Sequence, residues 1–211
     1  MPSMNRRNIL AGLAVAPLAS ELVVRASDVG QTSREMLREK YFPNFELVTH
    51  EGKKVRFYDD LIKDKIVVIN FMYAQCEGIC VPITRNLKRV QSLLGKRVGR
   101  DIFMYSISLK PEEDNPQKLK HYVQMHRIKP GWTFLTGRPE EIEVLRRTLG
   151  FSDGNPKLAK DLDNHIGMVK YGNERRQWWA MFPGKGNPAC MVKSILWMDE
   201  RKKVQAKTTS T

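Results

Sequence analysis

The sequence predicts an α/β fold in which a central mixed sheet is flanked by helices and preceded by an N-terminal hairpin. Residues 66–73 form a near-continuous apolar run of strand length, as expected for a strand buried on both faces. After Cys80, apolar side chains recur at a period of 3.6 residues up to Leu94, which is typical of a helix with one face on a sheet. Strand and helix patterns continue to alternate downstream, and this alternation indicates the α/β class.

The other elements follow from local patterns along the chain. Two short strands within residues 47–58 surround a turn at Glu51-Gly52. The helix after the central strand carries Pro82 in its first turn and ends at Gly95. Further elements are expected as a strand at 103–109, a helix at 116–126, a strand at 132–135, a helix at 139–149, a hairpin at 165–182 with its turn at Gly172-Asn173, and a last helix at 188–198.

The N-terminus has the pattern of an export signal. Arg6-Arg7 precede an apolar and small-residue stretch that ends at Ala19 and is too short to span a bilayer. Paired arginines indicate a twin-arginine signal, and Ala26 offers a cleavage site. We therefore expect the protein in the periplasm or cell envelope. The expected organisation is a signal at 1–26, a tether at 27–44, a folded domain at 45–199 and a basic tail at 200–211.

Composition limits the partners of the folded domain. The chain has 211 residues, 41% of them hydrophobic, which suits one ordinary core, and we expect a monomer. Its formal net charge is +13. Because the chain is expected to be exported and has no recognised nucleic-acid-binding motif, an acidic protein partner or an anionic membrane surface fits this charge better than DNA or RNA. A solvated basic surface without a dedicated partner is the alternative.

Cys76 and Cys80 follow the apolar strand at the point where a short loop leads into a helix. If the helix begins at the first cysteine, the two residues share a helix face, and both sulfurs can reach one metal ion or each other. A helix N-terminus also lowers the pKa of a thiol, because unpaired backbone N–H groups favour the thiolate. An oxidising compartment permits a disulfide between them. Reactive sulfur is the prediction, and two small buried hydrophobes are the alternative.

Several segments together carry a resemblance to a known family. They are Phe71–Cys80 with the sequence FMYAQCEGIC, Tyr105–Ser108, Gly131–Gly137, and His165 at the start of the second hairpin. With these motifs, residues 45–199 resemble the SCO/SenC family of copper-binding assembly proteins, and the order of elements looks like a thioredoxin-type domain. Three residues separate the cysteines, whereas thioredoxin-like oxidoreductases use C-x-x-C.

The resemblance implies a mononuclear copper site made by Cys76, Cys80 and His165, used in assembling the dinuclear copper centre of cytochrome c oxidase. Two thiolates and an imidazole can hold Cu(I) in a three-coordinate site, and they accept Cu(II) when a further ligand completes the shell. The implied function is a metallochaperone that delivers copper to an oxidase subunit or another envelope copper protein. Such a protein transfers metal and is not an enzyme.

A thiol:disulfide oxidoreductase that reduces the cysteines of a copper acceptor is the competing function, with Cys76 and Cys80 as its catalytic residues. His165 separates the two functions, since disulfide exchange does not need it. An ordinary hydrogen-bonded histidine is the alternative at that position. A peroxiredoxin-type peroxidase is disfavoured because Ile69 and Tyr73 occupy the places of the proline and threonine in that family's signature.

The chain also departs from the family pattern. Val81 follows the second cysteine where the family has proline, and Lys110 and Asn164 stand where it has aspartate. If those carboxylates orient the histidine, their loss weakens copper binding or shifts its potential. Asp161 or Asp163 can substitute for them.

The remaining candidate ligands are expected to have ordinary roles. His50, His121 and His126 lack metal-ligand spacing to the cysteines and are expected at the surface. Cys190 is expected to be buried among apolar neighbours in the last helix.

Overall fold

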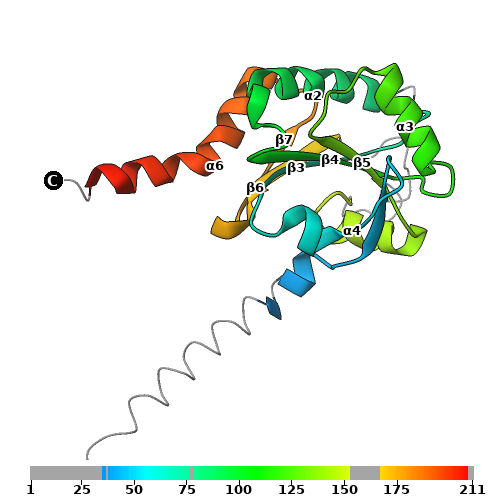
Figure 1. The fold of residues 1–211 in the computed structure, drawn as a ribbon, viewed down its shortest axis with the longest axis horizontal. Coiled ribbons are helices and arrows are strands. Elements are labelled where there is room, and N and C mark those ends of the chain that lie inside the picture. The colour runs from blue at the N-terminus through cyan, green and yellow to red at the C-terminus, as the bar shows by residue number, and fades with distance from the viewer. Residues whose placement is uncertain (1–34, 37, 77, 153–166, 209–211) are drawn as a thin grey trace, which may run out of the picture. The chain divides into compact units, whose positions relative to one another are not determined.

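The computed structural model describes residues 35, 36, 38–76, 78–152 and 167–208, with side chains as far as Asp199. The described part contains a seven-stranded mixed sheet in the order β2-β1-β5-β4-β3-β6-β7 (Figure 1). The strands are β1 (Glu46–Thr49), β2 (Lys54–Arg56), β3 (Ile66–Met72), β4 (Ile102–Ser108), β5 (Trp132–Thr136), β6 (Met168–Asn173) and β7 (Trp178–Pro183). The helices are α2 (Cys80–Leu94), α3 (Pro116–Met125), α4 (Pro139–Thr148) and α6 (Pro188–Thr208). The predicted α/β fold with an N-terminal hairpin is confirmed.

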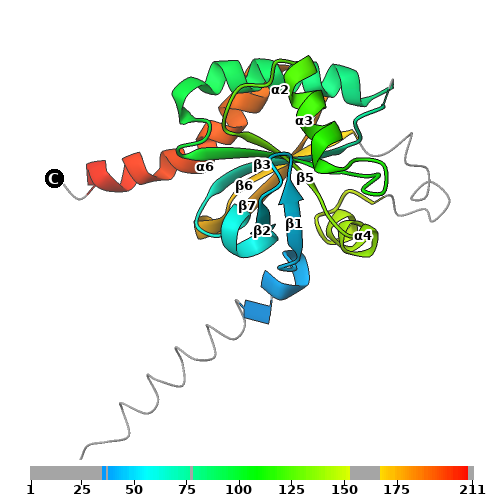
Figure 2. The ribbon, with the colours of Figure 1, turned by 45° about the vertical axis from the view of Figure 1, so that its right-hand side comes forward.

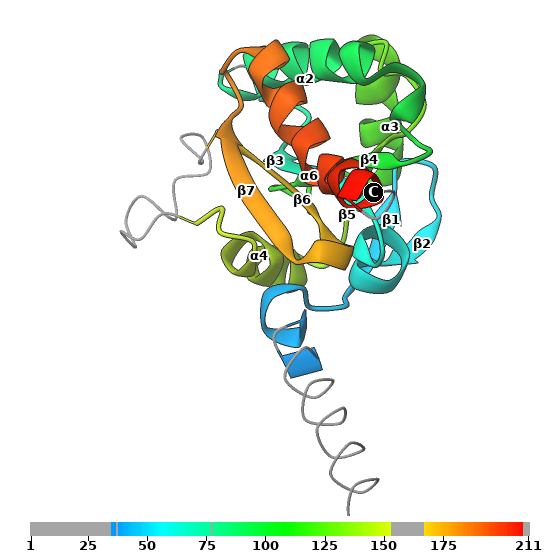
Figure 3. The ribbon, with the colours of Figure 1, turned by 90° about the vertical axis from the view of Figure 1, so that its left-hand side faces the viewer.

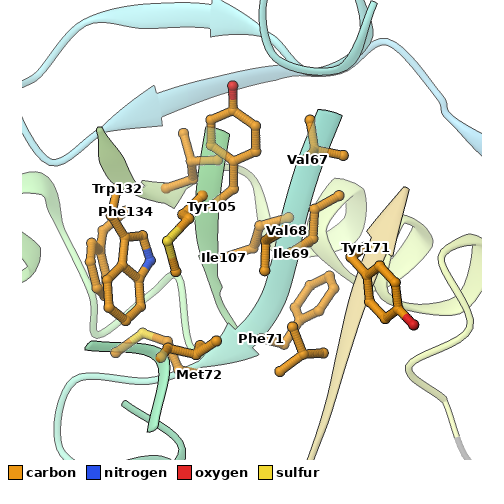
Figure 4. Close-up of a cluster of buried hydrophobic side chains, with 14 of the residues drawn as sticks. Val67, Val68, Ile69, Phe71, Met72, Tyr105, Ile107, Trp132, Phe134 and Tyr171 are labelled. Carbon is orange, nitrogen blue, oxygen red and sulfur yellow. The ribbon is translucent and has the colours of Figure 1, made fainter. Parts of the chain in front are cut away.

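The centre of the sheet is formed by β3 and its neighbours. β3 pairs in parallel with β4 and antiparallel with β6, and all of its residues are buried. Its apolar run is therefore explained by packing on both faces. Figure 4 draws this core, in which Trp132 and Phe134 of β5 stack with their ring centroids 5.2 Å apart.

Helices cover both faces of the sheet. α2, α3 and α6 lie on one face and α4 on the other (Figures 2 and 3). α2 buries the predicted stripe of Ile83, Leu87, Val90 and Leu94 and ends at Gly95, whose φ is 56°. α3 begins after Asn115, whose side chain accepts a hydrogen bond of 2.9 Å from the Lys118 N–H. This is the usual arrangement of a helix N-cap.

The second hairpin differs from the sequence prediction. Gly172 and Asn173 were expected in the turn, but both lie in β6, and the turn follows at Glu174–Arg176 (η3) and Gln177. Gly172 faces Trp179 of β7, and a Cβ added to it would overlap the Trp179 ring. The glycine is therefore required by cross-strand packing rather than by a turn.

Two expectations concern α6. Cys190 is exposed, so the prediction that it is buried is wrong. The buried face of the helix passes through Met191, Ile195 and Met198, and Cys190 lies beside this stripe. The helix also continues to Thr208, well past the expected end at Met198.

Among the helices of the described residues, none has the length and apolar character needed to cross a membrane. The signal expected at 1–26 lies outside the described residues.

Candidate functional site

Cys76 and Cys80 follow the carboxyl end of β3, where a loop leads into α2. The helix begins at Cys80 and not at Cys76, so the first cysteine belongs to the loop. The Cys76 N–H donates to the Tyr73 carbonyl over 3.3 Å and closes a tight turn. Cys76 is 7% exposed and Cys80 2% exposed, and neither forms a disulfide. The carboxyl end of a buried parallel strand thus presents two sheltered sulfurs.

The surroundings of Cys76 favour its thiolate. Burial acts to raise the pKa of the Cys76 thiol, but hydrogen bonds from the Cys80 thiol and N–H, from Tyr73 and from the Gly78 N–H outweigh burial, so the pKa is lowered. Backbone N–H groups before a helix are natural partners of a negative sulfur. Cys76 is therefore the nucleophilic member of the pair.

Cys80 has the opposite tendency. Burial, its hydrogen bond to Cys76, the negative charge on Cys76 and the charge of Asp114 together raise the pKa of the Cys80 thiol strongly. Cys76 is therefore the first of the two thiols to ionise, and the Cys80 thiol then donates to the Cys76 sulfur. The two thiols of the site thus have pKa values shifted in opposite directions.

Asp114 is a residue of this site that the sequence analysis missed. It follows β4, is 2% exposed, and its Oδ2 accepts hydrogen bonds from the Ser108 hydroxyl (2.6 Å) and the Ala74 N–H (3.0 Å). Ala74 lies in the cysteine loop, so the carboxylate fixes that loop to the end of β4. The signal for it was a carboxylate in a loop at the carboxyl end of a strand, just before a helix N-cap.

Lys110 also lies beside the cysteine loop. The Lys110 ammonium stands over the Tyr73 ring, 4.2 Å from the centroid. The Lys110 backbone N–H donates a 3.0 Å hydrogen bond to Ser108 Oγ. The Lys110 ammonium therefore lies against the ring of Tyr73, three residues before Cys76. The distance is well within the range of a cation–π interaction.

The segment that follows residue 166 packs against the cysteine loop. Gly167 is so close to Ile79 that a Cβ would overlap the Ile79 side chain, and its carbonyl accepts a 2.7 Å hydrogen bond from the Gly184 N–H. Ile79 directly precedes Cys80. His165, Asn164, Asp161 and Asp163 lie outside the described residues, but the described chain resumes two residues after His165, against this loop.

The other candidate ligands are placed as follows. His50 is half-buried, and its Nδ1 accepts a 3.2 Å hydrogen bond from the Phe134 N–H. The His126 ring packs on Tyr122 at 4.1 Å between centroids, and His121 is exposed on α3. Within the described part of the chain, no group of three or more histidine, cysteine, aspartate or glutamate side chains could hold a metal ion. The described residues therefore bring together two of the three predicted ligands.

Comparisons with known proteins agree with one another. The sequence model of the family described as SCO1/SenC matches residues 33–198. A SCO1 protein homolog of Bacillus subtilis (strain 168) is 31% identical over 116 residues, which are 54% of this chain and 58% of that protein. The alignment thus spans little more than half of the Bacillus protein.

Solved structures of similar fold include three of the same family. A SCO1/SenC family lipoprotein from Bacillus anthracis has a TM-score of 0.61 at 22% identity, covering 74% of this chain and 93% of that chain. Copper-bound ScoI from Bradyrhizobium japonicum has a TM-score of 0.59 at 23% identity, covering 73% of this chain and 96% of that chain. BsSco is a member of the Sco family of cytochrome c oxidase assembly proteins in which a disulfide switch is identified. Its structure has a TM-score of 0.59 at 23% identity, covering 72% of this chain and 88% of that chain. At these identities the likeness shows the shared fold.

Proposed function

Because the chain belongs to the SCO1/SenC family, we propose that it is a copper-binding metallochaperone of the cell envelope. It holds copper through Cys76, Cys80 and His165 and delivers it for assembly of the dinuclear copper centre of cytochrome c oxidase. The observation that carries the proposal is the pair of buried cysteines at the carboxyl end of β3, whose thiol pKa values shift in opposite directions. Soft sulfur ligands select Cu(I), and an imidazole is a compatible third donor. The copper-bound ScoI from Bradyrhizobium japonicum supports the choice of metal.

The contact between Gly167 and Ile79 supports His165 as the third ligand. Two residues of chain span at most about 7 Å, which limits how far position 165 can lie from Gly167. A histidine side chain adds several ångströms of reach. The short link from His165 to Gly167 therefore supports a site that combines the two cysteines with this histidine.

The protonation of the pair determines how copper binds. Cu(I) that joins both sulfurs displaces the Cys80 proton, so protons and copper compete at the site. A three-coordinate ion also leaves room for a ligand of the acceptor to bind before the donor ligands leave. The acceptor is a copper-accepting oxidase subunit or another envelope copper protein. A site with these properties suits transfer better than permanent storage.

The second candidate function is a thiol:disulfide oxidoreductase, and the lowered pKa of Cys76 favours it. The Cys76 thiolate would attack a disulfide of the copper acceptor and form a mixed disulfide, releasing one acceptor thiolate. Cys80, after losing its proton, would then attack the Cys76 sulfur and release the second acceptor thiolate. The acceptor gains two electrons, and this chain leaves with a Cys76–Cys80 disulfide. The disulfide switch named for BsSco is a related property of that protein.

The deciding experiment compares His165→Ala with the wild type and with His126→Ala as the matched control. Copper affinity is measured by competition with a Cu(I)-selective chelator, and disulfide reduction is measured on a small disulfide substrate. For a chaperone, His165→Ala lowers Cu(I) affinity at least 10–100-fold, as loss of even an outer partner does, while disulfide reduction is nearly unchanged. Cys76→Ser abolishes both activities. Wild-type affinity in His165→Ala would refute the three-ligand site and favour the oxidoreductase.

A further inference from the structure

A groove of about 380 Å³ lies beside the cysteine loop. Ala74 and Gln75, directly before Cys76, form one wall, and the exposed side of α3 forms the other. The α3 residues in it include His121, Tyr122 and Met125. The groove therefore opens from solvent onto the loop that holds the two thiols.

Two soft or borderline metal ligands line this groove. His121 and Met125 are four residues apart on α3, so their side chains lie on one helix face. Both are exposed, Met125 by 58%. Thioether sulfur and imidazole nitrogen are both ligands that Cu(I) accepts.

The groove is held in a fixed relation to the cysteines. Asp114, just before α3, binds the Ala74 N–H of the opposite wall. The hydroxyl groups of Tyr122 and of Thr84 on α2 share a hydrogen bond of 2.8 Å. Burial is the main reason that the pKa of Tyr122 is raised to about 12. Tyr122 thus ties the groove-lining face of α3 to α2, the helix that begins at Cys80.

We propose that His121 and Met125 form a transit site through which Cu(I) enters and leaves the cysteine site. This inference rests on the proposed copper function. Two donors hold Cu(I) weakly and leave positions open for an incoming or outgoing ligand. The Lys118 side chain lines the same groove, and its positive charge opposes a resident cation. A low-affinity site that empties readily is what transfer requires.

The transfer step is a ligand exchange without a change in oxidation state. The bonds from copper to the His121 nitrogen and the Met125 sulfur break while bonds to the Cys76 and Cys80 sulfurs form. The Cys80 proton passes to solvent as the second copper–sulfur bond forms. Unloading follows the same exchange in reverse, with the acceptor drawing the ion from the groove.

The first test removes all thiols and titrates Cu(I), buffered by a chelator, into the full chain carrying Cys76→Ser, Cys80→Ser and Cys190→Ser. NMR signals of the Met125 methyl group and the His121 ring are expected to shift with saturable Cu(I) binding. Adding Met125→Leu or His121→Ala lowers that affinity about tenfold or more, whereas His126→Ala does not. Signals that do not shift, or an equal effect of His126→Ala, would overturn the transit site.

The second test keeps the cysteines and adds Met125→Leu alone, which preserves the size of the side chain. The final Cu(I) affinity should equal that of the wild type, but loading from a Cu(I) chelate should slow several-fold. Unchanged loading rates would contradict the proposal. Binding in the thiol-free chain without binding at the wild-type cysteines would overturn the chaperone function and retain the groove site. Binding at the wild-type cysteines without binding in the thiol-free chain would retain the chaperone function and overturn the groove site.

Discussion

Two buried carboxylates fix the chain at opposite ends of β3. Asp114, at the carboxyl end, accepts from the Ser108 hydroxyl and the Ala74 N–H. Glu174, at the amino end, is 5% exposed and accepts from the Tyr58 hydroxyl (2.8 Å) and the Asp64 N–H (2.9 Å). In both cases a single carboxylate gathers donors from segments that are distant in sequence. Such charged acceptors are strong anchors when fully satisfied.

The difference lies in what each anchor holds. Glu174 joins the segment before β3 to the hairpin turn, and its described partners are a phenol, a backbone N–H and the Gln177 amide. Asp114 holds the cysteine loop, and its charge contributes to the raised pKa of Cys80. The same structural device therefore serves stability at one end and both stability and thiol chemistry at the other. The chemistry of an anchor depends on its neighbours.

The largest expected effect comes from removing the two charges in parallel. Asp114→Asn and Glu174→Gln should each lower the free energy of unfolding by about 1–3 kcal/mol, because each leaves buried donors less well satisfied. Denaturant unfolding monitored by tryptophan fluorescence measures this cost. Only Asp114→Asn should also alter the thiols: without the negative charge the pKa of Cys80 falls, so Cys80 is alkylated faster at a given pH. Equal alkylation of Cys80 in the two variants would remove the distinction between the anchors.

The second prediction sharpens the chemistry at the carboxyl end through its pH dependence. The pKa of Cys76 is lowered and that of Cys80 is raised. As pH falls below about 8.5, the usual pKa of a thiol, Cys76 keeps thiolate character while Cys80 is protonated. In a Cys190→Ser background, iodoacetamide near neutral pH should therefore modify Cys76 first, as read by peptide mass mapping. Preferential labelling of Cys80 would reverse the assigned roles.

The smallest expected effect compares two cations over aromatic rings. Lys110 stands over Tyr73 at the carboxyl end of β3, 4.2 Å from the ring centroid, and Lys65 stands over Phe103 at the amino end, at 5.6 Å. Lys110→Gln should lower the free energy of unfolding by about 0.5–1 kcal/mol, as for an exposed cation–π pair. Lys65→Gln should cost less through this interaction, since its separation is larger. A larger cost for Lys65→Gln would indicate that its hydrogen bond to the Asp60 carbonyl matters more.

The sequence predicted the parts of the fold that depend on local periodicity. The apolar run of β3 and the helical stripe of α2 were located almost to the residue, because burial of a strand on both faces and of a helix on one face leaves a periodic pattern. The two cysteines were recognised because they interrupt that pattern at a strand–helix junction. Their surroundings could be described only from three-dimensional structure.

Features that depend on contacts distant in sequence were missed or misread. Asp114 looks like one more acidic loop residue until β4 and the cysteine loop are brought together. Gly172 resembles a turn residue, yet the Trp179 ring across the hairpin is what excludes a side chain there. Cys190 was judged by its apolar neighbours, but one step around a helix changes a residue from the buried to the exposed side. The start of α2 at Cys80 also made the pair asymmetric, with one sulfur in the loop and one in the helix.

The close packing of Gly167 against Ile79 has an evolutionary consequence. A side chain larger than hydrogen at position 167 requires the Ile79 side chain to move or shrink. The two positions should therefore covary: glycine at 167 permits a large residue before the second cysteine, and alanine at 167 favours a smaller one or a shifted side chain. Drift at either position is coupled to the other, so the hairpin and the cysteine loop are expected to evolve as one unit although about ninety residues of chain separate them.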